Sequence, residues 1–188
     1  MNQITQFPAI SSSPKSGKES FLWKKKQLDF TLKDFWAWNQ SNLLENRTRG
    51  ILAEFIVKKA LRVENAIRIE WDAYDILTMN DVAIEVKSAS YIQSWAQSKP
   101  SSIRFNVAKK VGENGENKRW SDYYIFCLLY ENRQERVNPL DLSQWIFYVL
   151  RTEILDRKIG NQKTIGLSSL LQLHPVKCDY YQLSSAII

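Results

Sequence analysis

The sequence has little of the chemistry that builds thiol or imidazole metal sites. Its 188 residues include two cysteines and one histidine. Cys127 and Cys178 lie far apart and form no CxxC pair, which argues against a structural zinc site. Cys127 sits in the apolar run 124–129, so a buried thiol is expected there. His174 precedes Pro175, and we interpret it as a surface or capping residue rather than as a catalytic base.

Long hydrophobic runs are also missing. No run of about 18 apolar residues occurs, which predicts no membrane span. The first twenty residues contain no hydrophobic segment of signal-peptide length, so a cytoplasmic location is expected by default. These residues are rich in serine and carry lysines. We therefore predict a flexible basic tail over residues 1–20 and a single domain over 21–188.

Charge of one sign is in excess. The formal net charge is +6, the sequence pI is about 9.3, and apolar residues make up 44% of the chain. The apolar share is typical of a soluble globular domain, and the length is sufficient for one hydrophobic core. The basic balance favours a polyanionic partner such as DNA or RNA.

Hydrophobic spacing predicts the order of helices and strands. Helices are expected over 28–41, with Asp29 or Thr31 as its cap, and over 43–63, which contains no proline. A short helix beginning with Thr152 as its cap and a helical turn near 168–171 are expected later. Extended segments are expected at 67–71, 73–78, 82–88, 102–108, 122–130 and 144–151, with a turn at 79–81 and a polar loop at 112–117. This order predicts an α/β (α+β) fold, with a central mixed sheet flanked by helices.

The most informative segment is 82–87, Val-Ala-Ile-Glu-Val-Lys. Side chains alternate between the two faces of a strand, so Glu85 and Lys87 point one way while Ile84 and Val86 point into a core. A carboxylate beside an ammonium group on one face of a buried strand suits metal-assisted hydrolysis. The carboxylate would hold a divalent ion, and the lysine would steady the attacking water or the phosphate.

Other interpretations of the same residues remain open. Glu85 and Lys87 could form an exposed pair on a half-solvated sheet, where an ion pair adds little stability. Glu54, on the second helix, could be a metal ligand or a surface residue at the edge of the helix. Asp72 and Asp75 lie three apart, on opposite faces of one continuous strand, so only one can face Glu85. The spacing favours Asp75.

These residues together resemble a known motif. Asp75, nine intervening residues and Glu85-Val86-Lys87, preceded by a helix with Glu54, are similar to the PD-(D/E)XK, or restriction-endonuclease-like, nuclease superfamily. Gln93 also resembles the glutamine that follows the ExK motif in several of its branches. The resemblance covers about residues 43–95. It departs from the motif at residue 74, a tyrosine in place of proline, and no helix is evident after the ExK strand.

The resemblance implies a restriction-endonuclease-like core and a role for each matching residue. Asp75, Glu85 and Glu54 would bind Mg²⁺, for which Mn²⁺ can substitute, and Lys87 would assist catalysis. Gln93 would belong to the same catalytic site.

Basic and aromatic residues suggest where nucleic acid would bind. The 109–119 loop carries four cations, and we predict that it contacts DNA through Lys109, Lys110, Lys118 and Arg119. Among the seven tryptophans of the chain, five lie near basic residues and could stack on bases: Trp36, Trp38, Trp95, Trp120 and Trp145. Each one taken singly is better explained as a core residue.

The sequence therefore predicts a metal-dependent DNA endonuclease that hydrolyses phosphodiester bonds in duplex or branched DNA. A non-catalytic nucleic-acid-binding protein that retains the nuclease fold is one alternative, and a basic subunit of a larger complex is another. The complete Asp75, Glu85 and Lys87 set favours the enzyme. The oligomeric state stays open, with a homodimer among the alternatives.

Overall fold

The computed structural model describes residues 7, 10–64, 67–68, 73–112 and 115–187, and these form two compact units. Unit 1 spans Met1–Ser41 and Asn65–Arg68, and unit 2 spans Asn42–Glu64 and Ile69–Ile188. The expected division into a tail at 1–20 and one domain at 21–188 stays a prediction. Residues 69–71, expected to be extended, and Asp72, the rival of Asp75, lie outside the described residues.

Unit 1 consists of a β-hairpin followed by a helix. Strands β1 (Ser20–Trp23) and β2 (Lys26–Thr31) pair antiparallel, and helix α1 (Leu32–Gln40) follows without a loop. Thr31 caps the helix as predicted, because the Asp34 carboxylate accepts hydrogen bonds from the Thr31 backbone N at 2.7 Å and from its hydroxyl at 2.8 Å. The helix expected from residue 28 begins later, since residues 28–31 pair in the hairpin.

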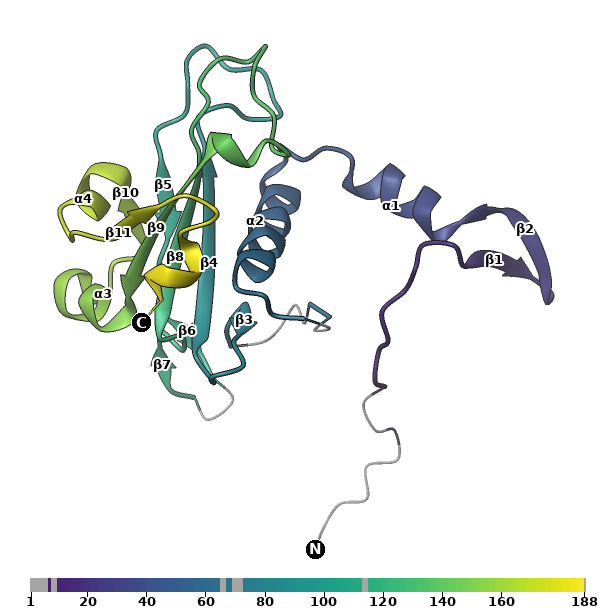
Figure 1. The fold of residues 1–188 in the computed structure, drawn as a ribbon, viewed down its shortest axis with the longest axis horizontal. Coiled ribbons are helices and arrows are strands. Elements are labelled where there is room, and N and C mark those ends of the chain that lie inside the picture. Colours follow the sequence, from purple (N-terminus) through teal and green to yellow (C-terminus); the bar gives the residue numbers. More distant parts are fainter. Residues whose placement is uncertain (1–6, 8–9, 65–66, 69–72, 113–114, 188) are drawn as a thin grey trace, which may run out of the picture. The chain divides into compact units, whose positions relative to one another are not determined.

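The core of unit 2 is a five-stranded sheet with strand order β11-β9-β8-β4-β3 (Figure 1). Strands β4 and β8 run parallel and the other neighbours run antiparallel, so the predicted central mixed sheet is confirmed. The parallel register places Glu85 of β4 beside Tyr124 of β8. The strands are β3 (Ile76–Leu77), β4 (Ala83–Ser90), β8 (Tyr123–Leu129), β9 (Trp145–Arg151) and β11 (Val176–Cys178).

Helix α2 (Asn46–Ala60) packs against one face of this sheet. Its buried residues include Ala53, Ile56 and Val57, which recur at helical spacing and join one core cluster with Ile84 and Val86 of β4. The helix is shorter than the predicted 43–63. It begins at residue 46 because the side chain of Glu45 accepts a hydrogen bond from the backbone N of Thr48 at 3.0 Å and so caps it.

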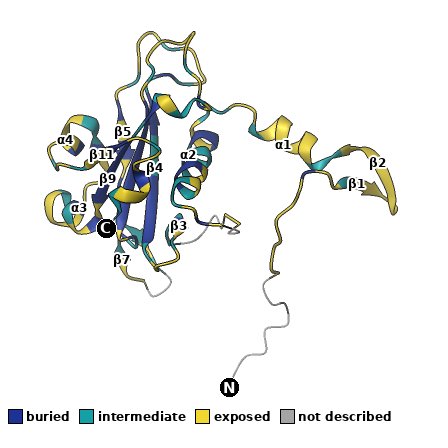
Figure 2. Ribbon diagram, in the orientation of Figure 1, coloured by how far each residue is buried: buried dark blue, intermediate teal, exposed yellow. Residues whose placement is uncertain are grey.

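The opposite face is covered by shorter elements. These are the β5–β10 pair (Arg104–Asn106 and Thr164–Gly166), α3 (Thr152–Ile159) and α4 (Leu167–Leu171). Phe105 packs edge-on against Phe126 of β8, with ring centres 5.0 Å apart. Because both faces are covered, every residue of β8 is buried, including Cys127 as predicted (Figure 2). A hairpin of β6 (Lys110–Val111) and β7 (Asn117–Lys118) and the 3₁₀ turns Leu142–Gln144 and Leu183–Ala186 complete the unit.

The differences from the predicted elements concern short segments. The strand expected at 73–78 pairs only over β3, and Thr152 is the first residue of α3 rather than its cap, which is Arg151. Between β4 and β8 the described residues contain strands and no helix, as the 102–108 pattern indicated. No helix in the described ranges has the length and apolar character to cross a bilayer. The cytoplasmic location and the restriction-endonuclease-like core stay predictions.

Candidate catalytic site

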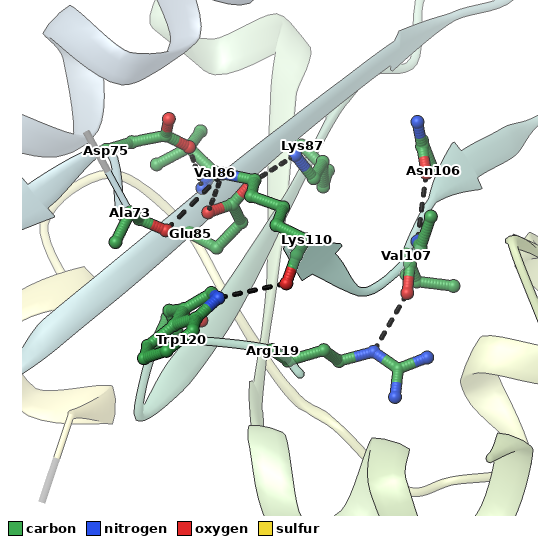
Figure 3. Close-up of polar contacts among 12 residues, drawn as sticks. Ala73, Asp75, Glu85, Val86, Lys87, Asn106, Val107, Lys110, Arg119 and Trp120 are labelled. Carbon is green, nitrogen blue, oxygen red and sulfur yellow. Dashed lines mark hydrogen bonds and ion pairs between the residues drawn. The ribbon is translucent and has the colours of Figure 1, made fainter. Parts of the chain in front are cut away.

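The β3–β4 hairpin places Asp75 against the edge of β4. The turn predicted at 79–81 is present, and it is closed by a hydrogen bond from the Thr78 N to the Val82 O at 3.0 Å. Ile76 and Ile84 form the last β3–β4 pair, and the Asp75 N still donates a hydrogen bond of 3.0 Å to the Ile84 O. Beyond that bond, the Asp75 side chain continues the contacts with β4. Its Oδ2 accepts a hydrogen bond of 2.7 Å from the Val86 N, so the carboxylate is held directly beside the backbone that follows Glu85 (Figure 3).

Glu85 and Lys87 come from one face of β4, and the structure joins them. The Lys87 ammonium group contacts Oε1 of Glu85. The Glu85 side chain is only 2% exposed, whereas that of Lys87 is 23% exposed. A buried carboxylate is stable only when cations or hydrogen-bond donors compensate for its lost hydration. The pair therefore lies where the core meets solvent, and the solvated-pair interpretation does not describe Glu85.

Lys110 of β6 is a second cation on the same carboxylate. Its Nζ lies 2.8 Å from Oε1 and 2.9 Å from Oε2 of Glu85, and 3.4 Å from the Ala73 O. The Trp120 indole donates a hydrogen bond of 3.0 Å to the Lys110 O and so fixes the backbone of β6. The sequence assigned Lys110 to a DNA-contacting loop; the structure places it on Glu85.

The electrostatics of Asp75 reflect several carboxylates in one place. The pKa of Asp75 is raised to about 6, mainly by burial and also by the negative charges of Glu85 and Glu54. The hydrogen bond from Val86 and the charge of Lys87 act in the opposite direction. The negative charge of Glu54, on α2, thus contributes to the raised pKa of Asp75. Three acidic side chains that interact in this way favour either a proton or a bound cation.

The donor set suits a hard divalent cation with few protein ligands. Among the residues that the structure describes, no group of three or more His, Cys, Asp and Glu side chains is arranged to hold a metal ion. Mg²⁺ is commonly bound by one or two carboxylates and otherwise keeps water and substrate phosphates. Asp75 and Glu85 fit that pattern. The identity of the ion stays a prediction.

Gln93 takes part in a different set of contacts, beyond the end of β4. Its Oε1 accepts a hydrogen bond of 3.1 Å from Arg49, and its Nε2 donates one of 2.7 Å to the Ser90 O. Arg49, only 4% exposed, also donates to the Ser88 hydroxyl at 3.1 Å. In the described part of the chain Gln93 thus bonds Arg49 and Ser90 rather than the carboxylates. Sequence reasoning missed Arg49, because nothing in the helical pattern distinguishes its burial.

The remaining cations of the predicted DNA loop differ in accessibility. Lys118 is 44% exposed, lies 3.1 Å from Glu116 and stands 4.3 Å from the Trp120 ring centre. Lys109 is half-buried. Arg119 is 5% exposed, and its guanidinium bonds the Val107 O at 2.8 Å and Asp156 at 2.5 Å. Arg119 therefore fastens the segment to α3.

Comparison with known proteins gives one family. The family model described as Bacteriophage T4 endonuclease IV matches residues 3–169 of the 188. The match covers unit 1 from residue 3, the β3–β4 hairpin, Lys110 and the sheet as far as β9, so it includes every residue of the candidate site. A search of curated proteins finds no match.

Proposed function

Because the chain belongs to the bacteriophage T4 endonuclease IV family, we propose that it is a DNA endonuclease that uses a divalent metal ion at Asp75 and Glu85. The observation that carries this proposal is that Lys87 and Lys110 both contact the buried Glu85 carboxylate, while the Asp75 carboxylate is held on the neighbouring Val86 N. The family supports endonucleolytic cleavage. The cluster supplies the carboxylates and the cations that phosphodiester hydrolysis requires.

Each residue of the cluster has a role that follows from its contacts. Asp75, with Glu85, would bind Mg²⁺ or Mn²⁺, and a bound ion supplies charge neutralisation and an activated water. The hydrogen bond from Val86 holds Asp75 in position before any substrate arrives. Lys87 touches Glu85 through its ammonium group, which has further hydrogens to donate to the attacking water or to a phosphoryl oxygen.

Glu54 and Gln93 support this centre from α2 and from the segment after β4. The charge of Glu54 acts on Asp75, and the described residues contain no group of three acidic side chains arranged to hold a metal ion, so we assign Glu54 a role at the metal site through a bridging water. Gln93 positions the strand: it bonds Arg49, which in turn bonds Ser88 of β4. Substitution of Gln93 would therefore act through the helix–strand packing.

Lys109 and Lys118 remain as phosphate contacts in the 109–119 segment. Lys118 stands beside the Trp120 ring, and a lysine next to an aromatic ring can contact phosphate while the ring contacts sugar or base. We leave Arg119 out of this set, because its guanidinium is buried and bonds the protein itself.

A non-catalytic DNA-binding protein is the second candidate, and one observation favours it. Lys87 and Lys110 together neutralise Glu85 without any metal ion. A carboxylate between two lysines can serve as a structural ion cluster. The two functions differ in whether the wild-type protein cuts DNA.

A nuclease assay separates them. The wild type, Glu85→Gln and Lys87→Met would be incubated with plasmid, linear and branched DNA in Mg²⁺, Mn²⁺ or EDTA. The proposal expects metal-dependent cleavage by the wild type and a loss of about 10² or more in rate in both variants. Binding in EDTA should remain, since phosphate contacts elsewhere supply most of the affinity.

Glu153→Gln is the matched control for Glu85→Gln. Glu153 is exposed on α3, and its substitution removes the same charge. Thermal melts check that each variant is folded. If the wild type binds DNA but cuts it with neither metal, the binding protein is the correct function. If the Glu85 and Lys87 variants cut as well as the control, the site is wrongly assigned.

A further inference from the structure

Unit 1, taken by itself, leaves large apolar side chains exposed. Within its described residues, Gly17 is the only buried one, and α1 contains no buried residue. Leu22, Trp23 and Trp38 are 63%, 61% and 82% exposed. Large aromatic groups left in solvent over one small unit are typical of an interaction surface.

The hairpin tip adds positive charge to these aromatic groups. Trp23 pairs with Lys26, and Lys24 and Lys25 form the connection between the strands. Both connecting lysines have left-handed backbone conformations, with φ values of 47° and 67°. Two-residue hairpin turns of this kind strongly prefer Asn-Gly, because most side chains are strained there. The chain thus keeps lysines where other residues would give a more stable turn.

The tip is presented by a preformed support. The Gly17 O and Glu19 O accept hydrogen bonds of 2.9 Å from the backbone N of Lys33 and Leu32, which ties the segment before the hairpin to the first turn of α1. Gly17 has a φ of 86°, and a Cβ added to it would lie 2.9 Å from the Trp36 ring. Both ends of the hairpin are therefore held against the start of α1, and little conformational entropy is lost when the hairpin binds a partner.

We infer that the hairpin tip is a DNA-binding element, with Lys24, Lys25 and Lys26 on phosphates and the Trp23 ring on a base or sugar. The inference rests on the proposed function and adds a contact surface in unit 1 to it. Lys24 Nζ already lies 4.7 Å from the Trp23 ring centre, so cation and ring form one patch. Stacking beside a phosphate-binding cation is a general way of holding nucleic acid.

Charge decides between DNA and a second copy of the chain as the occupant. None of the three tip lysines forms an ion pair with a carboxylate in the described part of the chain. A symmetric contact between two tips would bring two lysine triplets together, which costs free energy. A polyanion instead neutralises all three.

Two hairpin variants and one control test this inference on the full-length protein. Lys24→Asn with Lys25→Gly removes two charges and installs the pair that the turn prefers, so the hairpin should fold at least as well. Trp23→Ala removes the ring and keeps the lysines. Lys158→Gln with Lys177→Gln removes the same charge from two exposed positions of unit 2.

Affinity would be measured in EDTA, where cleavage is stopped, by fluorescence anisotropy with single-stranded and double-stranded oligonucleotides. At about 100 mM salt, we expect the double lysine variant to bind roughly 5–50-fold more weakly, with the slope of log K against log salt reduced by about two. We expect Trp23→Ala to lose roughly 5–100-fold in affinity with little change in slope. The control should stay within about threefold of the wild type.

Hairpin variants that bind both DNA forms as the control does would overturn the inference, and the proposed nuclease would still stand if the wild type cuts DNA. A wild-type protein that binds no DNA at low salt would refute both the hairpin inference and the proposed nuclease function. Sedimentation of the same proteins identifies the rival occupant: if Trp23→Ala turns a dimer into a monomer while its DNA affinity is unchanged, the patch binds a second copy. Salt slopes that fall equally in the hairpin variant and the control would show that only net charge matters.

Discussion

Glu85 is the residue whose surroundings decide the chemistry. It is almost fully buried, yet cations reach its carboxylate from β4 and β6. Two lysines more than offset the charge of one buried carboxylate, so a further cation is expected to displace one of them. Lys87 lies on the same strand and stays near Glu85 in any state. Lys110 comes from a separate hairpin, so we expect it to be the partner that a metal ion displaces, which would free its ammonium group for a phosphate oxygen.

Replacing Lys110 should therefore strengthen metal binding while it weakens cleavage. Lys110→Met removes a cation 2.8 Å from the Glu85 carboxylate, so we expect affinity for Mn²⁺ to rise about tenfold. The rate of DNA cleavage should fall, because one phosphate contact is lost. Calorimetric titration with Mn²⁺ measures the first effect. Lys118→Met, exposed in the same hairpin, should leave metal affinity unchanged, and an equal rise there would refute the competition.

Asp75 supplies a pH-dependent prediction for the metal-free protein. Its pKa is raised from an ordinary 3.8 to about 6 in the fold, chiefly by burial. A carboxyl group whose folded pKa is raised costs stability as the pH rises from about 4 through 6, because folding then opposes ionisation. Asp75→Asn keeps an oxygen for the Val86 N–H and removes this cost. At pH 7.5 in EDTA, we expect it to raise the free energy of unfolding by about 1–3 kcal/mol.

Urea titrations at pH 4, 6 and 7.5 check the sign of this effect. The advantage of Asp75→Asn should shrink to about 0.5 kcal/mol at pH 4, where the folded-state carboxyl is protonated and the unfolded-state one is only partly ionised. An advantage that is equal at all three pH values would mean that packing, rather than charge, explains it. Saturating Mg²⁺ should reverse the order at pH 7.5 by stabilising only the wild type.

At the scale of elements, Lys110 belongs to the β6–β7 hairpin, and Gly112 allows this hairpin to pack closely against Trp120. A Cβ on Gly112 would lie 2.2 Å from the Trp120 ring, the same ring whose indole bonds the Lys110 O. Gly112→Ala should therefore displace the ring or the hairpin. We expect a loss of about 1–3 kcal/mol in stability and a lower cleavage rate.

Gly50→Ala is the matched control for this substitution. Gly50 lies within α2 and has no neighbouring atom within 4 Å of an added Cβ. Alanine is the better helix former, so this change should add roughly 0.5–1 kcal/mol to stability and leave cleavage unaffected. Chemical denaturation of both variants measures the contrast. If Gly112→Ala is as well tolerated as Gly50→Ala, the Trp120 contact does not position the hairpin.

The elements that the sequence predicts well are the long and periodic ones. Helix α2 has apolar residues at helical spacing, and β4, β8 and β9 have continuous or alternating apolar runs, so local pattern suffices. The shorter strands β6, β7, β10 and β11 contain too few residues to show a period, and tertiary pairing alone creates them. Residues 28–31 show that a local pattern can also mislead. Their apolar spacing predicts a helix, but they form part of strand β2 in the β1–β2 hairpin.

The same distinction explains the candidate site. The shared face of Glu85 and Lys87 follows from strand parity, and the structure holds Asp75 on the Val86 N. The preference for Asp75 over Asp72 stays a prediction, because Asp72 lies outside the described residues. Lys110 lies 25 residues after Glu85, in a two-residue strand, and no spacing rule connects them. Arg119 looked like any other loop cation, because its burial depends on carbonyl groups brought in by β5 and α3.

At the scale of the whole molecule, both units carry basic residues that we expect to bind DNA. The chain carries a net charge of +6. Exposed lysines occur at the hairpin tip of unit 1, and the 109–119 segment of unit 2 carries Lys118, whose side chain is 44% exposed. DNA bound by both sets would release the counterions of several phosphates. Units joined in one chain also keep a bound strand at a raised local concentration for each other.

We therefore expect wild-type binding to DNA to depend steeply on salt. If the protein contacts about five phosphates, log K should fall with log salt at a slope near −4, so affinity should drop by two to three orders of magnitude between 50 and 200 mM salt. Anisotropy titrations in EDTA across this range measure the slope. Unlike either DNA-binding function, a protein whose basic residues serve only its own fold would give a flat response. If combined substitution of Lys24, Lys25 and Lys118 reduces the slope by about three, these lysines contact phosphates. If the slope is unchanged, the phosphate contacts lie elsewhere on the surface.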